Sequence, residues 1–277
     1  IGVAIVDHCI RPESKDEVLW LQHQVEELGL PFYSATFDVP RLSKEYKKSE
    51  ETIGRQVRYQ WLTEIARSEG YDYISVAHHK DDQAESILAH IIRGSGLNGL
   101  TGMSVVQSEY AIPVVRPLLD VTKENLLAYI ETKQISYCVD STNDDVRYQR
   151  NRIRHRIIPE LEAVNPAVVD AIVRLGSSVN EDVMVISDLT ARTFDKLVSI
   201  GKDEVSISRR ALRQEPLAIQ RRLWQRLVST IDSDLTLTSA HQEQLLDIVN
   251  TGEKKTFTIK SIKVIAQCDT IKVYCKH

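Results

Sequence analysis

The sequence has few cysteines, and none of them are paired. The four are scattered and form no Cys-x-x-Cys motif: Cys9, Cys138, Cys268 and Cys275. This spacing argues against a zinc ribbon, an iron–sulfur site and a disulfide scaffold, and it suits a reducing compartment such as the cytoplasm. Long apolar runs are also missing. None approaches the roughly 20 residues that a membrane-spanning helix needs, so no membrane partner is expected.

A strong charge of one sign is also absent. The 277 residues carry a net charge of −4, which does not mark the chain as a nucleic-acid-binding protein. The 42% hydrophobic and 27% charged residues are typical of a globular protein with one large or two ordinary domains. The sequence opens without methionine, inside an apolar run at 1–6 that is typical of a buried strand. We therefore expect further residues before Ile1.

Strand and helix patterns alternate over the first part of the chain. Apolar runs predict strands at 3–6, 32–37, 73–77 and 111–115, and helical spacing predicts helices at 15–28, 50–69 and from 84 to a stop at Arg93-Gly94. Thr122 is a predicted N-cap of a further helix. This alternation predicts an α/β fold, an open parallel sheet with helices on both faces.

The period changes near residue 165. An apolar helical stripe continues through 165–200 and predicts a long connecting helix. Beyond it we expect helices at 216–231 and 239–250, and an antiparallel pair of strands at 256–259 and 271–275. The predicted division is a catalytic domain at 1–164, the connecting helix at 165–200, and a small, mostly helical domain at 201–277.

The segment 77–85, Ala-His-His-Lys-Asp-Asp-Gln-Ala-Glu, carries the most chemistry. It lies where a predicted strand passes into a helix, a place where α/β sheets bind ligands and where helix N-termini attract anions. Asp81 and Asp82 are also ordinary first-turn acids. His78, Asp82 and Glu85 can converge at helical spacing, to bind a magnesium–phosphate group, hold a nucleophile or tune a proton transfer.

Basic residues suggest a second functional feature. Arg147, Arg150 and Arg154 lie at i, i+3 and i+7, on one predicted helix face without interleaved acids. A solvated face and a surface for the phosphates of a nucleic acid are both compatible with this pattern. Arg55 and Arg58 lie on a predicted packing helix, where arginine often only reaches solvent.

Glycines are concentrated in the segment that follows the histidines. They are Gly94, Gly96, Gly99 and Gly102, and they serve either tight turns or close approach of phosphate or RNA. The Gly-Lys-Ser/Thr ending of a Walker A loop is absent.

Six blocks in one order carry a resemblance to a known family. They lie at 6–14, 55–59, 77–85, 93–100, 116–119 and 150–155. Together they resemble the tRNA(Ile)-lysidine synthases, which are PP-loop ATP pyrophosphatases. The resemblance implies ATP and Mg²⁺ as cofactors, free L-lysine and a tRNA with a CAU anticodon as partners, and an adenylated tRNA intermediate. The product is lysidine at the wobble cytidine.

The resemblance also implies roles for individual residues. The catalytic candidates are His78, Asp82, Arg58 and Arg150; the ATP-binding candidates are Asp7, His8, Arg11 and His78. Lysine binding falls to Asp82 and Glu85, and tRNA binding to Arg93, Arg147, Arg152 and Arg154. No metal ligand is assigned.

One family feature is not found. The Ser-Gly-Gly-x-Asp-Ser loop that follows the first strand in the family does not occur in these residues, and we expect it upstream of Ile1. The resemblance therefore predicts that the 277 residues alone lack the first strand and are inactive. Three alternatives stay open: another PP-loop tRNA-modifying or amidating enzyme, a metal-dependent phosphoesterase with Asp7, His8 and the 78–82 segment as ligands, and a non-catalytic tRNA-binding remnant.

Overall fold

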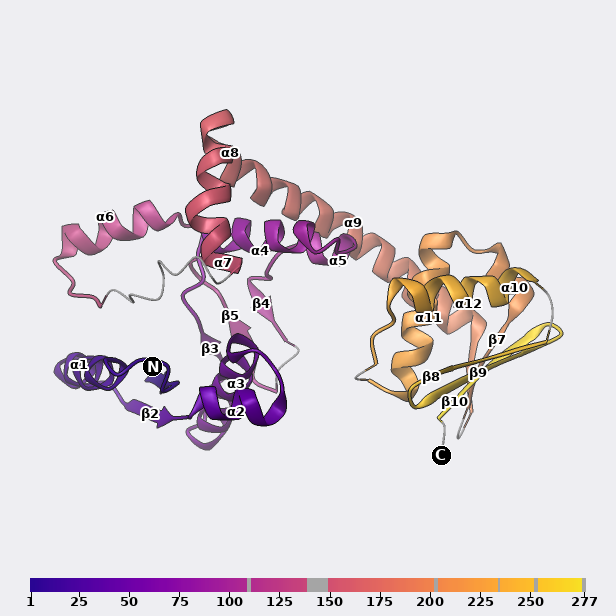
Figure 1. Cartoon of the computed structure of the whole chain (residues 1–277), viewed down its shortest axis with the longest axis horizontal. Helices are drawn as coiled ribbons and strands as arrows, with labels where there is room; N and C mark the ends of the chain where they lie inside the picture. The colour runs from indigo at the N-terminus through magenta and orange to yellow at the C-terminus, as the bar shows by residue number, and fades with distance from the viewer. Residues whose placement is uncertain (109–110, 139–148, 202–203, 234, 252–253, 276–277) are drawn as a thin grey trace. The chain divides into compact units, whose positions relative to one another are not determined.

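The computed structural model describes the whole chain except residues 109–110, 139–148, 202–203, 234, 252–253 and 276–277. It divides into two compact units, Ile1–Ser177 and Ser178–His277 (Figure 1). Helix α9, Val168–Leu197, contributes residues to both and confirms the long helix predicted from residue 165. Among the described residues, no helix combines the length and the apolar character needed to cross a membrane.

The first unit has an α/β architecture, as predicted. Strand β1 (Val3–Asp7) pairs in parallel with β2 (Phe32–Thr36). In a second sheet, β3 (Ile74–Ser75) pairs in parallel with β5 (Val114–Val115), and β4 (Val106–Gln107) joins β5 in antiparallel fashion. The strands expected at 73–77 and 111–115 thus form over two residues each, and β4 was not predicted.

Helices surround these strands. They are α1 (Ser14–Glu27), α2 (Val39–Tyr46), α3 (Glu50–Ser68), α4 (Lys80–Ile92), α5 (Leu97–Leu100), α6 (Lys123–Lys133), α7 (Gln149–Arg152) and α8 (Ile158–Val164). Helices α1, α3 and α6 begin within one residue of the predicted starts, and α4 begins at Lys80, before the predicted 84. Thr122 caps α6 as predicted, because its hydroxyl accepts a hydrogen bond from Asn125 N. Gly94 follows α4 with φ of 71°, a left-handed conformation that glycine adopts readily.

A cavity of about 640 Å³ lies between the two small sheets of this unit. Its lining includes Ala4 of β1, Ile74 of β3 and, from α3, Arg58 and Tyr59. In the described part of the chain, β1 and β3 are each the terminal strand of their sheet. His78, just past β3, also lines this cavity.

The second unit combines the part of α9 from Ser178 onward and three further helices with an antiparallel sheet. The further helices are α10 (Arg209–Gln214), α11 (Leu217–Ile231) and α12 (Ser239–Thr251). The sheet has the order β6-β7-β10-β9-β8, from strands Val198–Ile200, Glu204–Ser208, Thr270–Cys275, Ile262–Gln267 and Lys255–Ile259. Its core contains fully buried side chains from helices and strands, among them Trp224, Leu245, Ile262 and Ile271.

Strands form at both segments predicted for 256–259 and 271–275, as β8 and β10, but the prediction that these two strands pair with each other is wrong. Strand β9 lies between β8 and β10 and pairs with both. Two-residue turns connect the three strands, and each begins with a residue of positive φ that is not glycine, Lys260 (46°) and Cys268 (47°). Glycine or asparagine usually occupies such positions in tight hairpins and allows them to be predicted from sequence. Neither residue is present at these two positions, so the two hairpins were not predicted.

Candidate active site

The two histidines occupy the connection from β3 to α4, as the sequence predicted. His79 is the N-cap residue of α4, and its backbone N–H donates to Asp82 Oδ2 at 3.0 Å. The backbone N–H of Lys80 donates to Val121 O at 2.9 Å, and that of Lys123 donates to Asp81 Oδ2 at 2.8 Å. Asp81 and Asp82 therefore do fix the start of α4, which is their structural role.

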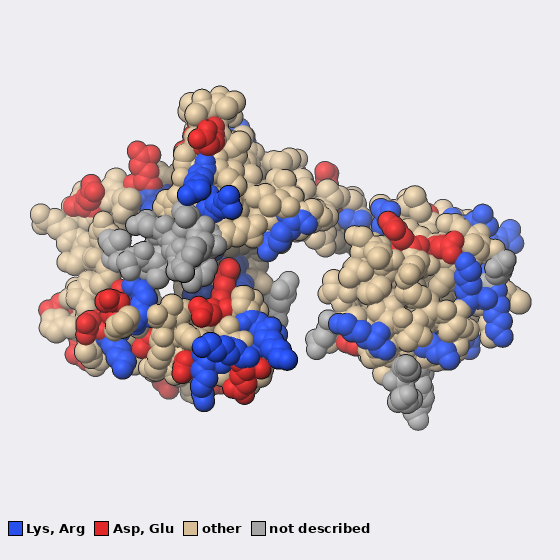
Figure 2. Space-filling model, viewed as in Figure 1, with Lys and Arg blue, Asp and Glu red and all other residues tan. Residues whose placement is uncertain are grey.

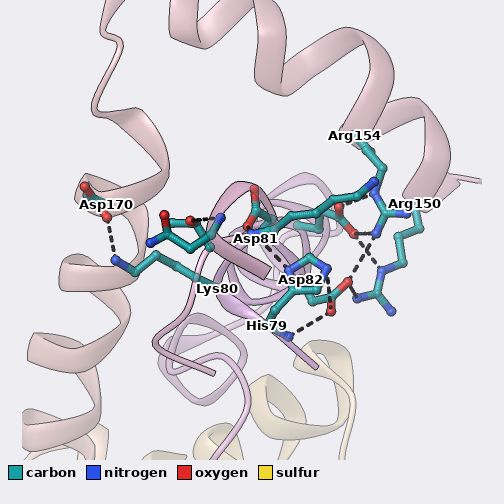
Figure 3. A network of polar contacts seen from close by, with 11 residues as sticks. His79, Lys80, Asp81, Asp82, Arg150, Arg154 and Asp170 are labelled. Atoms are coloured by element: carbon teal, nitrogen blue, oxygen red, sulfur yellow. Dashed lines mark hydrogen bonds and ion pairs between the residues drawn. The ribbon is translucent and has the colours of Figure 1, made fainter. Parts of the chain in front are cut away.

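Asp82 and Glu85 meet two arginines that come from far along the chain. Arg150 Nε donates to Glu85 Oε2 and its terminal nitrogen donates to Asp82 Oδ1, both at 2.8 Å. Arg154 Nε donates to Glu85 Oε1 at 2.6 Å, and its Nη2 lies 3.2 Å from Asp82 Oδ1. Figure 3 shows the two guanidinium groups pointing at the carboxylates of α4. We call these four residues the carboxylate–arginine cluster.

The cluster is mostly sheltered from water. Glu85 is 1% exposed, whereas the Arg154 and Arg150 side chains are 21% and 41% exposed. Burial opposes the charge of Arg150, but its hydrogen bond to Glu85 and the charge of Asp82 outweigh burial and raise its pKa. A buried carboxylate with several charge-assisted hydrogen bonds is stable only while its partners remain.

His78 lies beside this cluster and is kept uncharged. Burial lowers the pKa of His78 to about 4; the charge of Asp82 opposes this shift, whereas Arg116, Arg150 and Arg55 add to it. Arg116 Nε donates to His78 Nδ1 in a long hydrogen bond of 3.3 Å. His78 is therefore neutral at physiological pH.

His79 and Asp81 form a close pair next to it. His79 Nδ1 lies 3.4 Å from Asp81 Oδ2, and the interaction with His79 is the main cause that lowers the pKa of Asp81 to about 2. Burial opposes this shift, and the backbone N–H of Lys123 supports it. The side chain of Lys80 points the other way, to Asp170 of α9 at 2.8 Å (Figure 3).

The end of β1 has its own polar contacts. Asp7 is buried, and its Oδ1 accepts hydrogen bonds from Cys9 N at 2.8 Å and Ser14 Oγ at 2.6 Å. These bonds fix the turn into α1, so Asp7 has a structural role besides the one predicted for ATP. Arg11 forms a two-pronged pair with Glu17, at 3.1 and 2.9 Å.

His8 lies against α3, where a Cβ at Gly54 would be 3.7 Å from its ring. Burial and then the charge of Arg58 lower the pKa of His8, and Asp7 opposes them. Arg58 itself lines the cavity that also includes His78. The structure thus places Asp82 and Arg150 in direct contact, with His78 in their field and Arg58 at the same cavity.

A family comparison agrees with this architecture. Residues 1–161 match the family model of the PP-loop domain, which is more than half of the chain. The chain belongs to the PP-loop domain family.

Several curated relatives of this PP-loop chain carry the same name. A tRNA(Ile)-lysidine synthase of Porphyromonas gingivalis is 31% identical over 209 residues, which cover 76% of this chain and 44% of the relative. That of Caldanaerobacter subterraneus is 30% identical over 275 residues, covering 98% of this chain and 57% of the relative. The chain spans about half the length of these curated relatives.

A solved structure shares the fold of the PP-loop domain. It is the U34-tRNA thiolase NcsA from Methanococcus maripaludis with its 4Fe-4S cluster. The TM-score is 0.51 at 17% identity, over 64% of this chain and 61% of the thiolase. At this identity the likeness concerns the fold.

The arginines predicted to bind tRNA lie in different surroundings. Arg154 belongs to the carboxylate–arginine cluster, whereas Arg152 of α7 is exposed. Arg93 lies at the C-cap of α4 and lines a groove of about 840 Å³ on α3, together with Arg55 and Arg67. Figure 2 shows Lys and Arg mixed with Asp and Glu over α2 and α3. Arg147 lies outside the described residues.

The predicted helix brings Arg150 and Arg154 to the same carboxylates, as expected of one helix face, but its helical geometry changes along its length. A π-helical turn at Ile153–Ile157 separates α7 from α8. Such turns are rare and occur often at functional sites. Here the π-helical turn contains Arg154, while Ile153 packs with Leu88 and Ile158 in a small core.

One of the glycines after α4, Gly102, is required by the local backbone conformation and by the neighbouring side chain. Gly102 has φ of 70°, and a Cβ there would be 2.6 Å from Gln83 Oε1. The side chain of Gln83 forms two hydrogen bonds with the backbone of Met103. Its Oε1 accepts from the N–H of Met103 at 2.6 Å, and its Nε2 donates to the carbonyl oxygen at 2.9 Å. The turn reading therefore explains this position.

A further residue of this site was not predicted. Arg116 is 2% exposed and donates to Ser104 O at 2.8 Å and Gln107 Oε1 at 2.7 Å, besides His78. Its block, 116–119, carries the family resemblance, and this was the available signal. Periodicity alone does not distinguish a buried arginine from an exposed one.

The described residues do not form a closed metal cage. In the described ranges, no three His, Cys, Asp or Glu side chains are placed to share an ion. The carboxylates of Asp82 and Glu85 already accept bonds from arginines. Asp82 and Glu85 are therefore poor candidates to bind a Mg²⁺ ion directly. The metal ligands proposed for the phosphoesterase alternative do not come together in the described part of the chain.

Proposed function

We propose that the protein carrying this chain is a tRNA(Ile)-lysidine synthase of the cytoplasm. It joins free L-lysine to C2 of the wobble cytidine in a tRNA with a CAU anticodon, at the expense of ATP. The observation that carries the proposal is the carboxylate–arginine cluster beside neutral His78 at the end of β3, in a PP-loop domain. Membership in this family supports the use of ATP, and the names of the curated relatives supply the tRNA substrate.

The proposed chemistry has two displacements. In the first, the O2 atom of cytosine attacks the α-phosphorus of ATP; the bond to the β-phosphate oxygen breaks and pyrophosphate leaves. In the second, the neutral ε-amine of lysine attacks C2, the C2–O2 bond breaks and AMP leaves with the oxygen. The adenylation is needed because the unmodified O2 is a poor leaving group. The protein contributes alignment and charge stabilisation.

Arginines supply the positive charge in this scheme. We assign Arg150 and Arg58 to the phosphate charge that develops during transfer of AMP, because both lie near His78 at the carboxyl end of β3. Asp7, His8 and Arg11 are assigned to the ATP side of the site, at the end of β1. Mg²⁺ enters as part of the magnesium–ATP substrate.

Lysine recognition is assigned to Asp82 and Glu85. Both carboxylates are paired with arginines in this structure, so an incoming ammonium group competes with Arg150 and Arg154 for them. Asp82 is the more accessible of the two, at 8% exposure against 1% for Glu85. We therefore place the first contact of lysine at Asp82.

The test is incorporation of labelled lysine into tRNA. The protein that contains these residues is incubated with ATP, Mg²⁺, lysine and a tRNA(Ile) transcript with CAU, and a transcript with UAU serves as control. We expect label in the CAU transcript only, with release of AMP and pyrophosphate, and loss of both in Arg150→Ala. Failure of label to enter while ATP and tRNA bind would refute lysine ligation. Sulfur transfer to the tRNA, or ATP-independent hydrolysis, would point to the alternative enzymes.

A further inference from the structure

Arg116 has an unusual environment for an arginine. It is 2% exposed, and the three acceptors that it contacts are uncharged: Ser104 O, Gln107 Oε1 and His78 Nδ1. A guanidinium group keeps its charge at all accessible pH values and has no acceptor atom. Burying such a charged group without a negatively charged partner costs free energy, so a role in packing alone does not account for Arg116.

The contact with His78 determines where the imidazole carries its proton. Because Arg116 can only donate, His78 Nδ1 must offer its lone pair. A neutral imidazole has one N–H, which is then at Nε2. A second proton at Nδ1 would face the guanidinium directly. The contact therefore selects one tautomer and opposes the imidazolium form.

We propose that Arg116 is a positioning residue that holds His78 neutral and protonated at Nε2, so that His78 donates to an oxygen atom of the bound nucleotide. An imidazole with its proton at Nε2 recognises a hydrogen-bond acceptor on the ligand, such as a phosphoryl or carbonyl oxygen. In this state Nε2 has no lone pair with which to take a proton, so His78 is not the general base for the lysine amine. The assignment to a nucleotide rests on the proposed function; the tautomer does not.

Other charged groups act on the same imidazole. Asp82 favours its protonation, while Arg150 and Arg55 oppose it together with Arg116, and Arg58 lines the adjoining cavity. Burial and these arginines together outweigh Asp82. Among these charged groups in the described part of the chain, Arg116 is the one that forms a hydrogen bond with the imidazole ring of His78, and its removal abolishes that bond.

The direct test is nitrogen-15 NMR of the histidine side chains in the whole protein, with His78 assigned through His78→Gln. Long-range proton–nitrogen correlations distinguish the two tautomers and the imidazolium. We expect wild-type His78 to show the Nε2–H form from about pH 8 to about pH 5.5, since its pKa lies near 4. In Arg116→Lys and Arg116→Met we expect a mixture of tautomers, and in Arg116→Met also a pKa closer to 6.5. A wild-type Nδ1–H form, or folded Arg116 variants with unchanged His78 signals, would overturn the proposal.

A matched control separates this effect from packing. Gln107→Leu removes another acceptor of Arg116 but leaves the bond to His78, so we expect the wild-type tautomer there. Near-ultraviolet circular dichroism identifies variants that fail to fold, and Arg116→Lys keeps the charge if Arg116→Met does not fold.

Transfer of AMP provides the functional readout. We expect kcat/KM to fall about 10- to 100-fold in Arg116→Lys, by analogy with the loss that follows when a group that orients a metal-binding histidine is removed. In Arg116→Met the rate should also gain an acid limb as the pKa of His78 rises. An unchanged pH profile would contradict the positioning role. Complete absence of lysine ligation in wild type, with the expected NMR result, would refute the proposed function and leave the role of Arg116 intact.

Discussion

Arg154 Nε lies 2.6 Å from Glu85 Oε1, although the two residues are 69 positions apart in the chain. The bond joins the π-helical turn to the middle of α4, and Arg150 adds a second bond to the same carboxylate at 2.8 Å. A carboxylate that is 1% exposed thus serves as the anchor for a segment that carries three of the predicted site residues, Arg150, Arg152 and Arg154.

Removing this anchor should destabilise the first unit. Loss of one partner from a buried ion pair typically costs about 3–5 kcal/mol, but Arg150 is 41% exposed and can regain water. We therefore expect Glu85→Gln to lower the free energy of unfolding by about 2–3 kcal/mol, measured by urea denaturation. The control is Asp188→Asn, which breaks an exposed pair with Arg192 and should cost less than about 0.5 kcal/mol. Equal effects in both variants would contradict the anchoring role.

Asp81 should make stability depend on pH in the acid range. Its pKa is about 2 in the folded protein and near 4 when unfolded, so its contribution is present above about pH 4 and is lost as the pH falls toward 2. We expect Asp81→Asn to have a lower urea midpoint than wild type at pH 7 and an equal one near pH 2. Asp182→Asn, an exposed acid on α9, should match wild type throughout. A deficit that persists at pH 2 would show that the charge is not responsible.

Gly176 should be intolerant of a side chain because α9 approaches α4 and α5 closely there. A Cβ would lie 2.7 Å from Ile87 Cδ1 and 3.2 Å from the carbonyl oxygen of Leu100. We expect Gly176→Ala to destabilise by about 1–3 kcal/mol. Shortening the fully buried Ile87 to Val in the same protein should recover part of the loss, although Ile87→Val alone costs about 0.5–1.5 kcal/mol. Additive losses in the double variant would show that the two side chains do not compete for space.

Two arginines of the same segment should behave differently toward tRNA. Arg152 is exposed, so Arg152→Ala should reduce the slope of log K against log salt by about 0.7–0.9, as for one lost phosphate contact. Arg154 already binds Glu85 and Asp82, so Arg154→Ala should act mainly on the urea midpoint. Filter binding at several salt concentrations, combined with denaturation, separates the two effects. A salt slope that changes with Arg154 and not with Arg152 would reverse this assignment.

Much of the first unit was predictable because its signals are local. The strand at residue 3, the helix from residue 50, the cap at Thr122 and the glycine after α4 each depend on a few neighbouring residues. Helix α2, with Asp38 accepting from Arg41 N, was not predicted, since its eight residues give too short a pattern.

The contacts within the site were less predictable. The sequence identified Asp82 and Glu85 as one group and Arg150 and Arg154 as another, but no single-sequence pattern pairs side chains separated by 65 to 72 positions. The role of Arg116 depends on its burial, which becomes visible only when β4 and β5 are placed beside β3. The domain limits and the individual roles of the site residues remain predictions.

The two kinds of sheet imply different rates of amide hydrogen exchange. In the second unit, β9 and β10 are paired on both sides and alternate inward with fully buried side chains. In the first unit, β1 and β3 pair on one side only within the described chain and border a cavity. Backbone groups without a second strand exchange through small local openings, whereas enclosed ones need cooperative unfolding. The strands nearest the proposed chemistry are thus the ones whose amides should exchange with deuterium first.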